Sequence, residues 1–593
     1  MKRAVAAWFL PFLVLTFTLF CSAADPLAVP ILPLDEVHAG MHGVAYTVFE
    51  GVKPESMDVD ILGVLRNVNG PRGDLILVRL KGSKPEYTGV VAGMSGSPVY
   101  VDGKLVGAIA FRIGEFSKEP IAGVTPIQQM LEINALDASP AGNNPPSASD
   151  PAAASKKVSG PGAPGLESYA KLLAPIDAPL VFNGFSEEAV RLFAPGFAAA
   201  GVVPVMGAGS ASNERQPEPL EAGSAVSAVL VRGDMDIAAT CTVTYVDAQR
   251  LLACGHPLLQ FGQVSIPMNK AQVLTTLASP ANAFKIVNTT ETVGSFVQDR
   301  HSGILGRFDR QPEMIPVTLS LLGPQPKQFH YEVLNNSKLT PVAIMATVFN
   351  ALQGVNEGGS DVTYRLMGRI QVSGYPDVTL RNMYTPSDGA IPAPFLLAIS
   401  LGDRFDRIYG NPYEKPVIKG VELNLELIKD RRQARLESAR TDITEARPGD
   451  QIVIETVLRP YRGEPFVKQI PVRIPASSPK GQLRILVSDG ETLDRLRRNS
   501  PGFGRNLDMA STIALLNKER SNSRVYVSLL EANPEALVQD KVMPTLPPSI
   551  LNVMDGMRGN QDMVVMGESA VSEASTPVDY AVSGAQLIVV NVK

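Results

Sequence analysis

Histidine, cysteine and tryptophan are scarce in this chain: its 593 residues include five, three and one of them, respectively. The histidines and cysteines form no His-Glu-x-x-His or Cys-x-x-Cys pattern, so the sequence predicts no zinc site. It also has no phosphate-binding loop and no dinucleotide fingerprint. Basic residues are not in excess, because the formal net charge is −5, and no lysine and arginine stripe is interleaved with aromatic residues. We therefore expect no metal, no cofactor and no nucleic-acid partner.

Long apolar runs are also missing, except at the N-terminus, so no later stretch is expected to span a bilayer. Lys2 and Arg3 precede an apolar run over residues 4–20, and the small residues 22–24 offer a cleavage site before Asp25. This pattern predicts a signal peptide at 1–24 and export to the periplasm or the extracellular space. If the signal is retained, it tethers the protein to the membrane. Cys21 follows the bulky Phe20, which argues against lipidation.

Cys241 and Cys254 remain after cleavage, in a compartment where disulfides persist. They flank a predicted hairpin, residues 241–254, that turns at Asp247 and Ala248. With a two-residue turn, position 241 lies directly opposite position 254, close enough for a disulfide. Both a cross-strand disulfide and a pair of buried free thiols remain open.

Glycine and proline are plentiful, with 50 and 48 copies, which favours a β-rich protein with many turns. Strand signals are dense between residues 38 and 112, where an Asp102-Gly103 pair between apolar runs predicts a tight hairpin. Residues 137–165 are rich in Ala, Ser, Pro, Gly and Asn, which predicts a flexible linker. From Val421 to Leu427 apolar and polar residues alternate, as in a half-buried strand.

The segment Gly93-Met94-Ser95-Gly96-Ser97-Pro98 has the features of a nucleophile turn. A serine hydroxyl needs exposure on a tight turn, N–H donors for the developing oxyanion, and a neighbouring base. The flanking glycines permit the turn, and the amides of Gly93 and Ser95 are candidates for the oxyanion hole. A strand, this segment, a second strand, an Asp-Gly turn and a third strand resemble the second barrel of trypsin-like and HtrA-like peptidases.

His256 is the leading candidate for the base, because it follows the cysteine hairpin directly, at a strand end where side chains are displayed. His301 is the second candidate, and His38 and His42, in an N-terminal loop, rank below it. His330 is the fifth histidine of the chain.

The Ser95 segment, together with Asp102-Gly103-Lys104-Leu105-Val106-Gly107-Ala108, resembles the nucleophile region of the SpoIVB peptidases, chymotrypsin-like serine peptidases that act outside the cytoplasmic membrane. Residues 242–245 through Gly255-His256 resemble the hairpin that ends in the family's catalytic histidine, and residues 302–306 resemble another of its segments. These similarities lie in patches between residues 35 and 350. The resemblance implies a nucleophile at Ser95, a base at His256, and a groove lined in part by residues 121–126.

Two features depart from the family pattern. Ser95 precedes His256, whereas the histidine comes first in the sporulation peptidase, which indicates rearranged barrel halves. The family's acid lies shortly before the serine motif, where residues 80–83 of this chain hold none. Asp74 and Asp299 are the two candidate acids, and a Ser–His dyad or an inactive site remains open as well.

The predicted fold is therefore mainly β: a trypsin-like double β-barrel peptidase region split by a linker, then a β-sandwich and a mixed C-terminal region. The expected divisions are a signal peptide (1–24), a Ser-motif region (25–136), the linker (137–165), a His-hairpin region (166–410), the sandwich (411–480) and a mixed α/β region (481–593). The predicted function is that of an exported serine endopeptidase. Its expected substrate is a protein or peptide, with an envelope-associated protein as one option. Self-cleavage in the linker is a further option. The alternative is a non-catalytic envelope scaffold that keeps a peptidase fold, and a purely structural surface protein ranks last.

Overall fold

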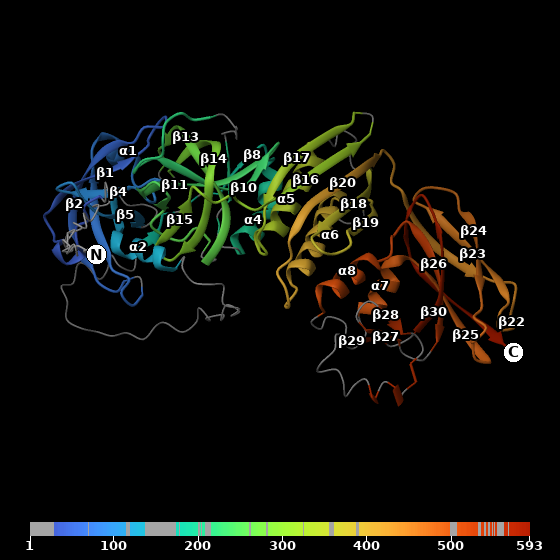
Figure 1. Cartoon of the computed structure of the whole chain (residues 1–593). Helices are drawn as coiled ribbons and strands as arrows, with labels where there is room; N and C mark the ends of the chain where they lie inside the picture. Colours follow the sequence, from blue (N-terminus) through green and yellow to red (C-terminus); the bar gives the residue numbers. More distant parts are fainter. Residues whose placement is uncertain are drawn as a thin grey trace, which may run out of the picture.

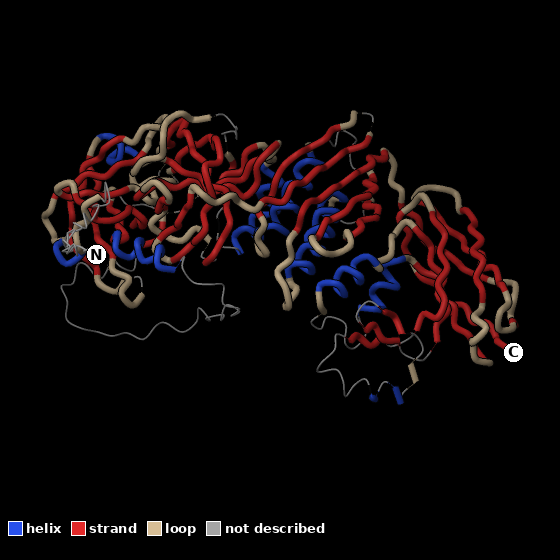
Figure 2. Tube along the Cα trace, viewed as in Figure 1, coloured by secondary structure: helices blue, strands red, loops and turns tan. Residues whose placement is uncertain are grey.

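The computed structural model describes residues 29–593, apart from 137–172 and shorter gaps at 69, 114–118, 177, 179, 200–201, 203, 208–214, 260–261, 280–282, 324, 355–360, 387–390, 499–506, 532–534, 539–540, 544–545, 548, 551, 554–562 and 567–568. The predicted signal peptide and linker lie outside the described residues. Strands predominate over helices, and the structural units follow one another along the molecule (Figures 1 and 2). Within the described part, no helix is both long and apolar enough to cross a membrane.

The first unit is a closed six-stranded barrel. Its strands pair in the order β4-β1-β2-β3-β6-β5, and β5 closes the ring by pairing with β4. Its interior is filled by one apolar cluster that includes Val59, Val78 and Ile109. The predicted hairpin at Asp102-Gly103 is confirmed, because Val101 pairs with Lys104 across it. The strands of this barrel are β1 (His42–Thr47), β2 (Glu55–Leu65), β3 (Leu75–Lys81), β4 (Pro98–Val101), β5 (Lys104–Ile113) and β6 (Ile121–Pro126).

Short elements accompany the first barrel. They are η1 (Leu34–Glu36), α1 (Ser83–Thr88), α2 (Ile127–Leu136) and β7 (Leu173–Pro175). Helix α2 buries Ile127 and Met130 in a cluster that also holds Leu252 and Leu305 of the next unit. Strand β7 adds a seventh strand to the barrel by pairing with the end of β5.

The second unit is another closed six-stranded barrel, ordered β10-β13-β14-β15-β12-β11, with β11 pairing back to β10. Counted in chain order, both barrels place their first strand between the second and the fourth, and their sixth between the third and the fifth. The two barrels therefore share one topology, and the predicted double barrel is confirmed. Its strands are β10 (Ala225–Gly233), β11 (Asp236–Val246), β12 (Arg250–Ala253), β13 (Gly262–Leu277), β14 (Phe284–Arg300) and β15 (Gly303–Arg307), and beside it lie β8 (Leu180–Asn183), α4 (Glu187–Ala199) and β9 (Pro204–Met206).

The sheet of the second barrel continues, through the pairing of β10 with β17, into a mixed α/β layer. Helices α5 and α6 pack on each other, and their buried residues, such as Phe349 and Phe405, share one cluster with the strands. The sequence indicated that the alternating strand at Val421–Leu427 belongs to the sandwich. In the structure it pairs instead with β16 and β18 of this layer. The elements are β16 (Met314–Leu322), β17 (Lys327–Leu334), α5 (Leu339–Gln353), β18 (Thr363–Val372), β19 (Val378–Tyr384), α6 (Ala393–Tyr409) and β20 (Ile418–Ile428).

The last unit is a β-sandwich whose two sheets share one apolar core, with Ile454 on one sheet and Ile485 on the other. One sheet contains β21 (Gln433–Arg440), β23 (Gln451–Pro460), β24 (Phe466–Arg473) and β31 (Ala581–Ser583). The other contains β22 (Glu445–Ala446), β25 (Gly481–Ser488), β26 (Arg524–Glu531), β30 (Ser569–Pro577) and β32 (Ala585–Val592). Strands beyond residue 480 thus complete the sandwich, together with α7 (Gly490–Arg498), α8 (Met509–Asn517) and a small sheet of β27 (Glu535–Val538), β28 (Lys541–Met543) and β29 (Met563–Met566).

Candidate active site

The Ser95 turn lies in the first barrel, in the segment that enters β4. Gly93 and Gly96 both have positive φ, 95° and 98°, a conformation that residues with a Cβ rarely adopt. The turn is closed by the Ser97 hydroxyl, which donates to the Met94 carbonyl (2.6 Å), and is anchored to β5 by the Gly96 amide, which donates to the Ile109 carbonyl (2.7 Å). The glycines therefore allow the sharp turn that the sequence predicts.

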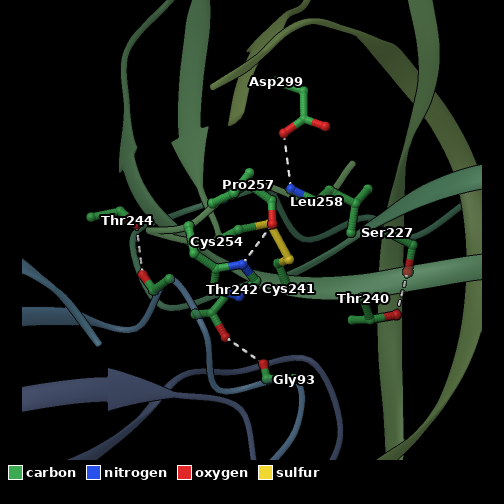
Figure 3. The surroundings of a disulfide bond; sticks show 12 residues. Gly93, Ser227, Thr240, Cys241, Thr242, Thr244, Cys254, Pro257, Leu258 and Asp299 are labelled. Carbon is green, nitrogen blue, oxygen red and sulfur yellow. Dashed lines mark hydrogen bonds between the residues drawn. A yellow bond between two sulfur atoms is a disulfide. The ribbon is translucent and has the colours of Figure 1, made fainter. Parts of the chain in front are cut away.

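The second barrel meets this turn through β11. The Thr242 hydroxyl donates to the Gly93 carbonyl (2.9 Å; Figure 3), and the Thr242 amide donates to the Ser95 carbonyl (2.7 Å). The Thr244 hydroxyl donates to the Gly96 carbonyl (2.7 Å). A Cβ on Gly96 would lie 1.9 Å from the Thr242 carbonyl oxygen. Because that contact is to backbone, only glycine fits at this position.

A disulfide joins Cys241 to Cys254 at the base of the hairpin that leads to His256 (Figure 3). The pairing register differs from the predicted one. Asp247 accepts hydrogen bonds from the amides of Gln249 and Arg250 and so widens the turn, and a bulge between Val243 and Tyr245 shifts the register again. Val243 therefore pairs with Ala253, so Cys241 is not directly opposite Cys254 as predicted. The Cα atoms of the two cysteines are nevertheless 5.1 Å apart, and the disulfide forms.

His256 follows a chain reversal that is clamped against the first barrel. Cys254 and Gly255 both have positive φ, 67° and 71°, and the Thr125 hydroxyl donates to the Gly255 carbonyl (2.6 Å). A Cβ on Gly255 would lie 3.0 Å from the Cβ atoms of Ala108 and Ala110. These contacts fix the start of the His256 loop against β5 and β6.

The His256 ring is buried, with 3% of its surface exposed, whereas the other four histidines are exposed. Its Nδ1 lies 2.8 Å from the Pro257 carbonyl oxygen. A carbonyl oxygen only accepts, so Nδ1 carries the proton and Nε2 holds the lone pair. This tautomer is the one that a general base requires.

The two candidate acids lie in different places. Asp299 is at the end of β14, is 1% exposed, and accepts hydrogen bonds from the amides of Leu258 (2.8 Å; Figure 3) and Leu259 (2.6 Å), directly after the His256-Pro257 pair. Asp74 precedes β3, where its carboxylate binds the Arg66 guanidinium and the Asn67 amide. The structure thus brings Asp299, and not Asp74, to the His256 loop.

The Ser95 side chain is fully buried, with 0% exposed. Among the described residues its Oγ has no hydrogen-bond partner. The amides of Gly93 and Ser95 likewise make no hydrogen bond within the described part of the chain. Two N–H groups without acceptors beside a buried hydroxyl are what an oxyanion hole needs before substrate arrives.

Sequence reasoning missed a buried lysine at this junction. The stem of Lys285, on β14, packs against Gly93, and its ammonium donates to the Thr47 hydroxyl (2.7 Å). The Thr47 hydroxyl in turn lies 3.4 Å from that of Thr242, which holds the Gly93 carbonyl. Burial lowers the pKa of Lys285 from 10.5 to about 7. No local pattern around residue 285 marks it, because its partners lie in distant parts of the sequence.

A family match covers the first barrel, which carries Ser95. Residues 22–131 match the SpoIVB peptidase S55 family. The match covers η1, β1–β6 and the first half of α2, so the resemblance is confirmed for the SpoIVB-like barrel with its serine turn. His256 and Asp299 lie outside the matched residues. No curated protein and no solved structure matches the chain. The SpoIVB match supports a serine peptidase with a protein substrate.

Proposed function

We propose that this protein is an exported serine endopeptidase of the SpoIVB type, with Ser95 as nucleophile and His256 as general base. The observation that carries the proposal is the junction of the two barrels. There the serine turn is bonded to the strand that leads into the histidine hairpin, through Thr242 and Ser95 (2.7 Å). This contact holds the serine turn against the hairpin that leads to His256, although the two lie far apart in the chain, and so supports pairing the two residues as nucleophile and base.

In the proposed reaction the Ser95 Oγ attacks the scissile carbonyl carbon while its proton passes to His256 Nε2. The carbonyl oxygen becomes an oxyanion and accepts hydrogen bonds from the amides of Gly93 and Ser95. Collapse of this intermediate breaks the C–N bond, and His256 gives its proton to the leaving amine. Water then hydrolyses the acyl-enzyme by the same steps, with His256 again taking the proton.

Asp299 has a positioning role in this proposal. Its carboxylate binds the amides of Leu258 and Leu259, which follow the Pro257 carbonyl that accepts from His256 Nδ1. It therefore holds the loop that orients the imidazole, and its charge stabilises the imidazolium that forms when His256 takes the proton.

A fluorophosphonate probe tests the activated serine. We expect labelling of the mature protein, and loss of labelling in Ser95→Ala and in His256→Ala. Ser302→Ala and His301→Ala are the matched controls, because both residues belong to the β14–β15 turn and not to the serine turn or the hairpin. Labelling that persists in Ser95→Ala would overturn the assignment of the nucleophile.

Export is tested separately, by N-terminal sequencing of protein recovered from the envelope or the medium. Cleavage at the predicted site gives a mature chain that begins at Asp25. An intact N-terminus on membrane-bound protein identifies a retained anchor instead.

The burial of Ser95 favours the second candidate function, a non-catalytic envelope scaffold. A substrate carbonyl cannot reach a side chain with 0% of its surface exposed, so catalysis requires the junction to open. Folded protein that stays unlabelled in every form, while it still binds a partner protein, would establish the scaffold function and exclude the peptidase.

A further inference from the structure

Among the described strands of the first sheet, β7 alone lies outside the closed ring. Its residues Leu173–Pro175 pair antiparallel with the end of β5: Pro175 with Phe111, Ala174 with Arg112 and Leu173 with Ile113. The next residue continues the ladder, because the Ile176 amide donates to the Ala110 carbonyl (2.8 Å). The chain then enters β8, which pairs with β11 of the second barrel. The segment 173–176 therefore lies against β5 where the chain crosses between the barrels.

The end of this segment lies next to both catalytic loops. Ile176 is bonded to Ala110, and the adjacent residue, Ile109, exchanges hydrogen bonds with Gly96 and Ser97 of the serine turn. A Cβ on Gly255 would lie 3.0 Å from the Cβ of Ala110. Because Gly255 directly precedes His256, Ala110 also lies beside the start of the His256 loop. The backbone of Ile176 is thus bonded to β5 one residue away from the contacts of the serine turn, and at the residue that packs on Gly255.

The segment has the features of a bound extended peptide. Ala174 and Pro175 are exposed, whereas Ile176 is fully buried, in the same apolar cluster as Met94 and Ile109. Antiparallel ladders alternate bonded and non-bonded pairs, so Ala174 faces β5 with its amide, while Pro175, which has none, occupies the non-bonded position. Backbone pairing with one buried anchor is how peptides bind by strand addition.

We propose that the edge of β5 at residues 110–113 is the substrate-binding site, that it takes an extended peptide with an apolar residue in the Ile176 position, and that this chain's own residues 173–176 block it. This proposal rests on the proposed peptidase function, and it adds the substrate class, an extended peptide with an apolar residue. Strand β6, which the resemblance implies as a wall of the groove, pairs with β3 over residues 121–124 and with β5 over residues 122–126, so it offers a peptide no open edge over residues 122–124.

The test uses binding and not turnover, so that an inactive serine does not decide it. All proteins carry Ser95→Ala, and the probe is a fluorescent peptide of sequence Leu-Leu-Ala-Pro-Ile, the chain's own residues 172–176. Ala174→Pro removes the amide that faces β5, and Ile176→Ala removes the anchor but leaves the backbone able to pair. Pro175→Ala, at the outward position, is the matched control.

We expect at least tenfold tighter peptide binding by the Ala174→Pro and Ile176→Ala proteins than by the control. The tethered segment is present at an effective concentration of about millimolar, so it outcompetes dilute peptide when intact. A probe that ends in aspartate instead of isoleucine should not bind. Equal binding by all the proteins, or no binding by any of the variants that fold, would overturn the proposal. Fluorophosphonate labelling of the same variants with Ser95 restored then reports separately on the proposed peptidase function.

Discussion

Lys285 should make the free energy of unfolding of the barrels depend on pH, and replacing it with an uncharged residue should remove that dependence. Burial lowers its pKa from 10.5 to about 7, so the folded protein holds the amine neutral in a range where the unfolded chain protonates it. The unfolded state binds more protons between about pH 7 and 10.5, and the free energy of unfolding therefore rises with pH across that window. At about 1.4 kcal/mol per pH unit, the contribution amounts to about 5 kcal/mol.

Lys285→Met keeps the stem that packs on Gly93 and removes the titrating group. At pH 6 the substitution removes the destabilisation of about 5 kcal/mol that comes from burying an amine which the unfolded chain protonates. It also loses the hydrogen bond to Thr47, worth about 1 kcal/mol. The variant should therefore be more stable by up to about 4 kcal/mol. Near pH 10.5 only the lost hydrogen bond remains, so the variant should be less stable by about 1 kcal/mol. The effect of the substitution thus changes sign with pH.

Scanning calorimetry of both proteins from pH 6 to 10.5 measures this difference. The transition of the barrels is identified as the one that shifts when the Cys241–Cys254 disulfide is reduced. A constant offset between the proteins at every pH would refute the reasoning, since it would mean that Lys285 titrates at its ordinary pKa in the folded state.

Three further predictions concern the same junction. Asp299→Asn should lower the rate of fluorophosphonate labelling by up to about 10⁴-fold while the thermal transition persists; an unchanged rate would remove Asp299 from the mechanism. Replacing Cys241 and Cys254 by alanine should cost about 3 kcal/mol in urea unfolding, as expected for a closed loop with a sequence separation of 13. Gly96→Ala should abolish labelling, because its Cβ would meet the Thr242 carbonyl at 1.9 Å, whereas Gly103→Ala, with open space around it, should label normally.

The first barrel could be predicted from sequence because its signals are local. The Asp102-Gly103 turn has positive φ at both residues, 51° and 75°, and the strands beside it follow directly in the chain. The turn at Ser95 is of the same kind, since Gly93 and Gly96 stand within the motif itself.

The rest of the site depends on tertiary contacts that no local pattern encodes. Sequence alone does not separate Asp299 from Asp74, because only the fold brings the end of β14 to the His256 loop. It gives no sign of Lys285, whose partners, Thr47 and Gly93, lie in the other barrel. It also misplaces the strand at residues 418–428 in the sandwich, because alternation shows that one face is buried but not which neighbours bury it.

A nick in the polypeptide between residues 137 and 172 would break no contact among the described residues. Each barrel would stay whole, because each closes its own ring of strands, and the two fragments would still be joined by the threonine contacts to the serine turn and by the ladder between β7 and β5. The serine and the histidine would then belong to different chains. The protein would have become a heterodimer whose proposed active site exists only while its subunits remain together.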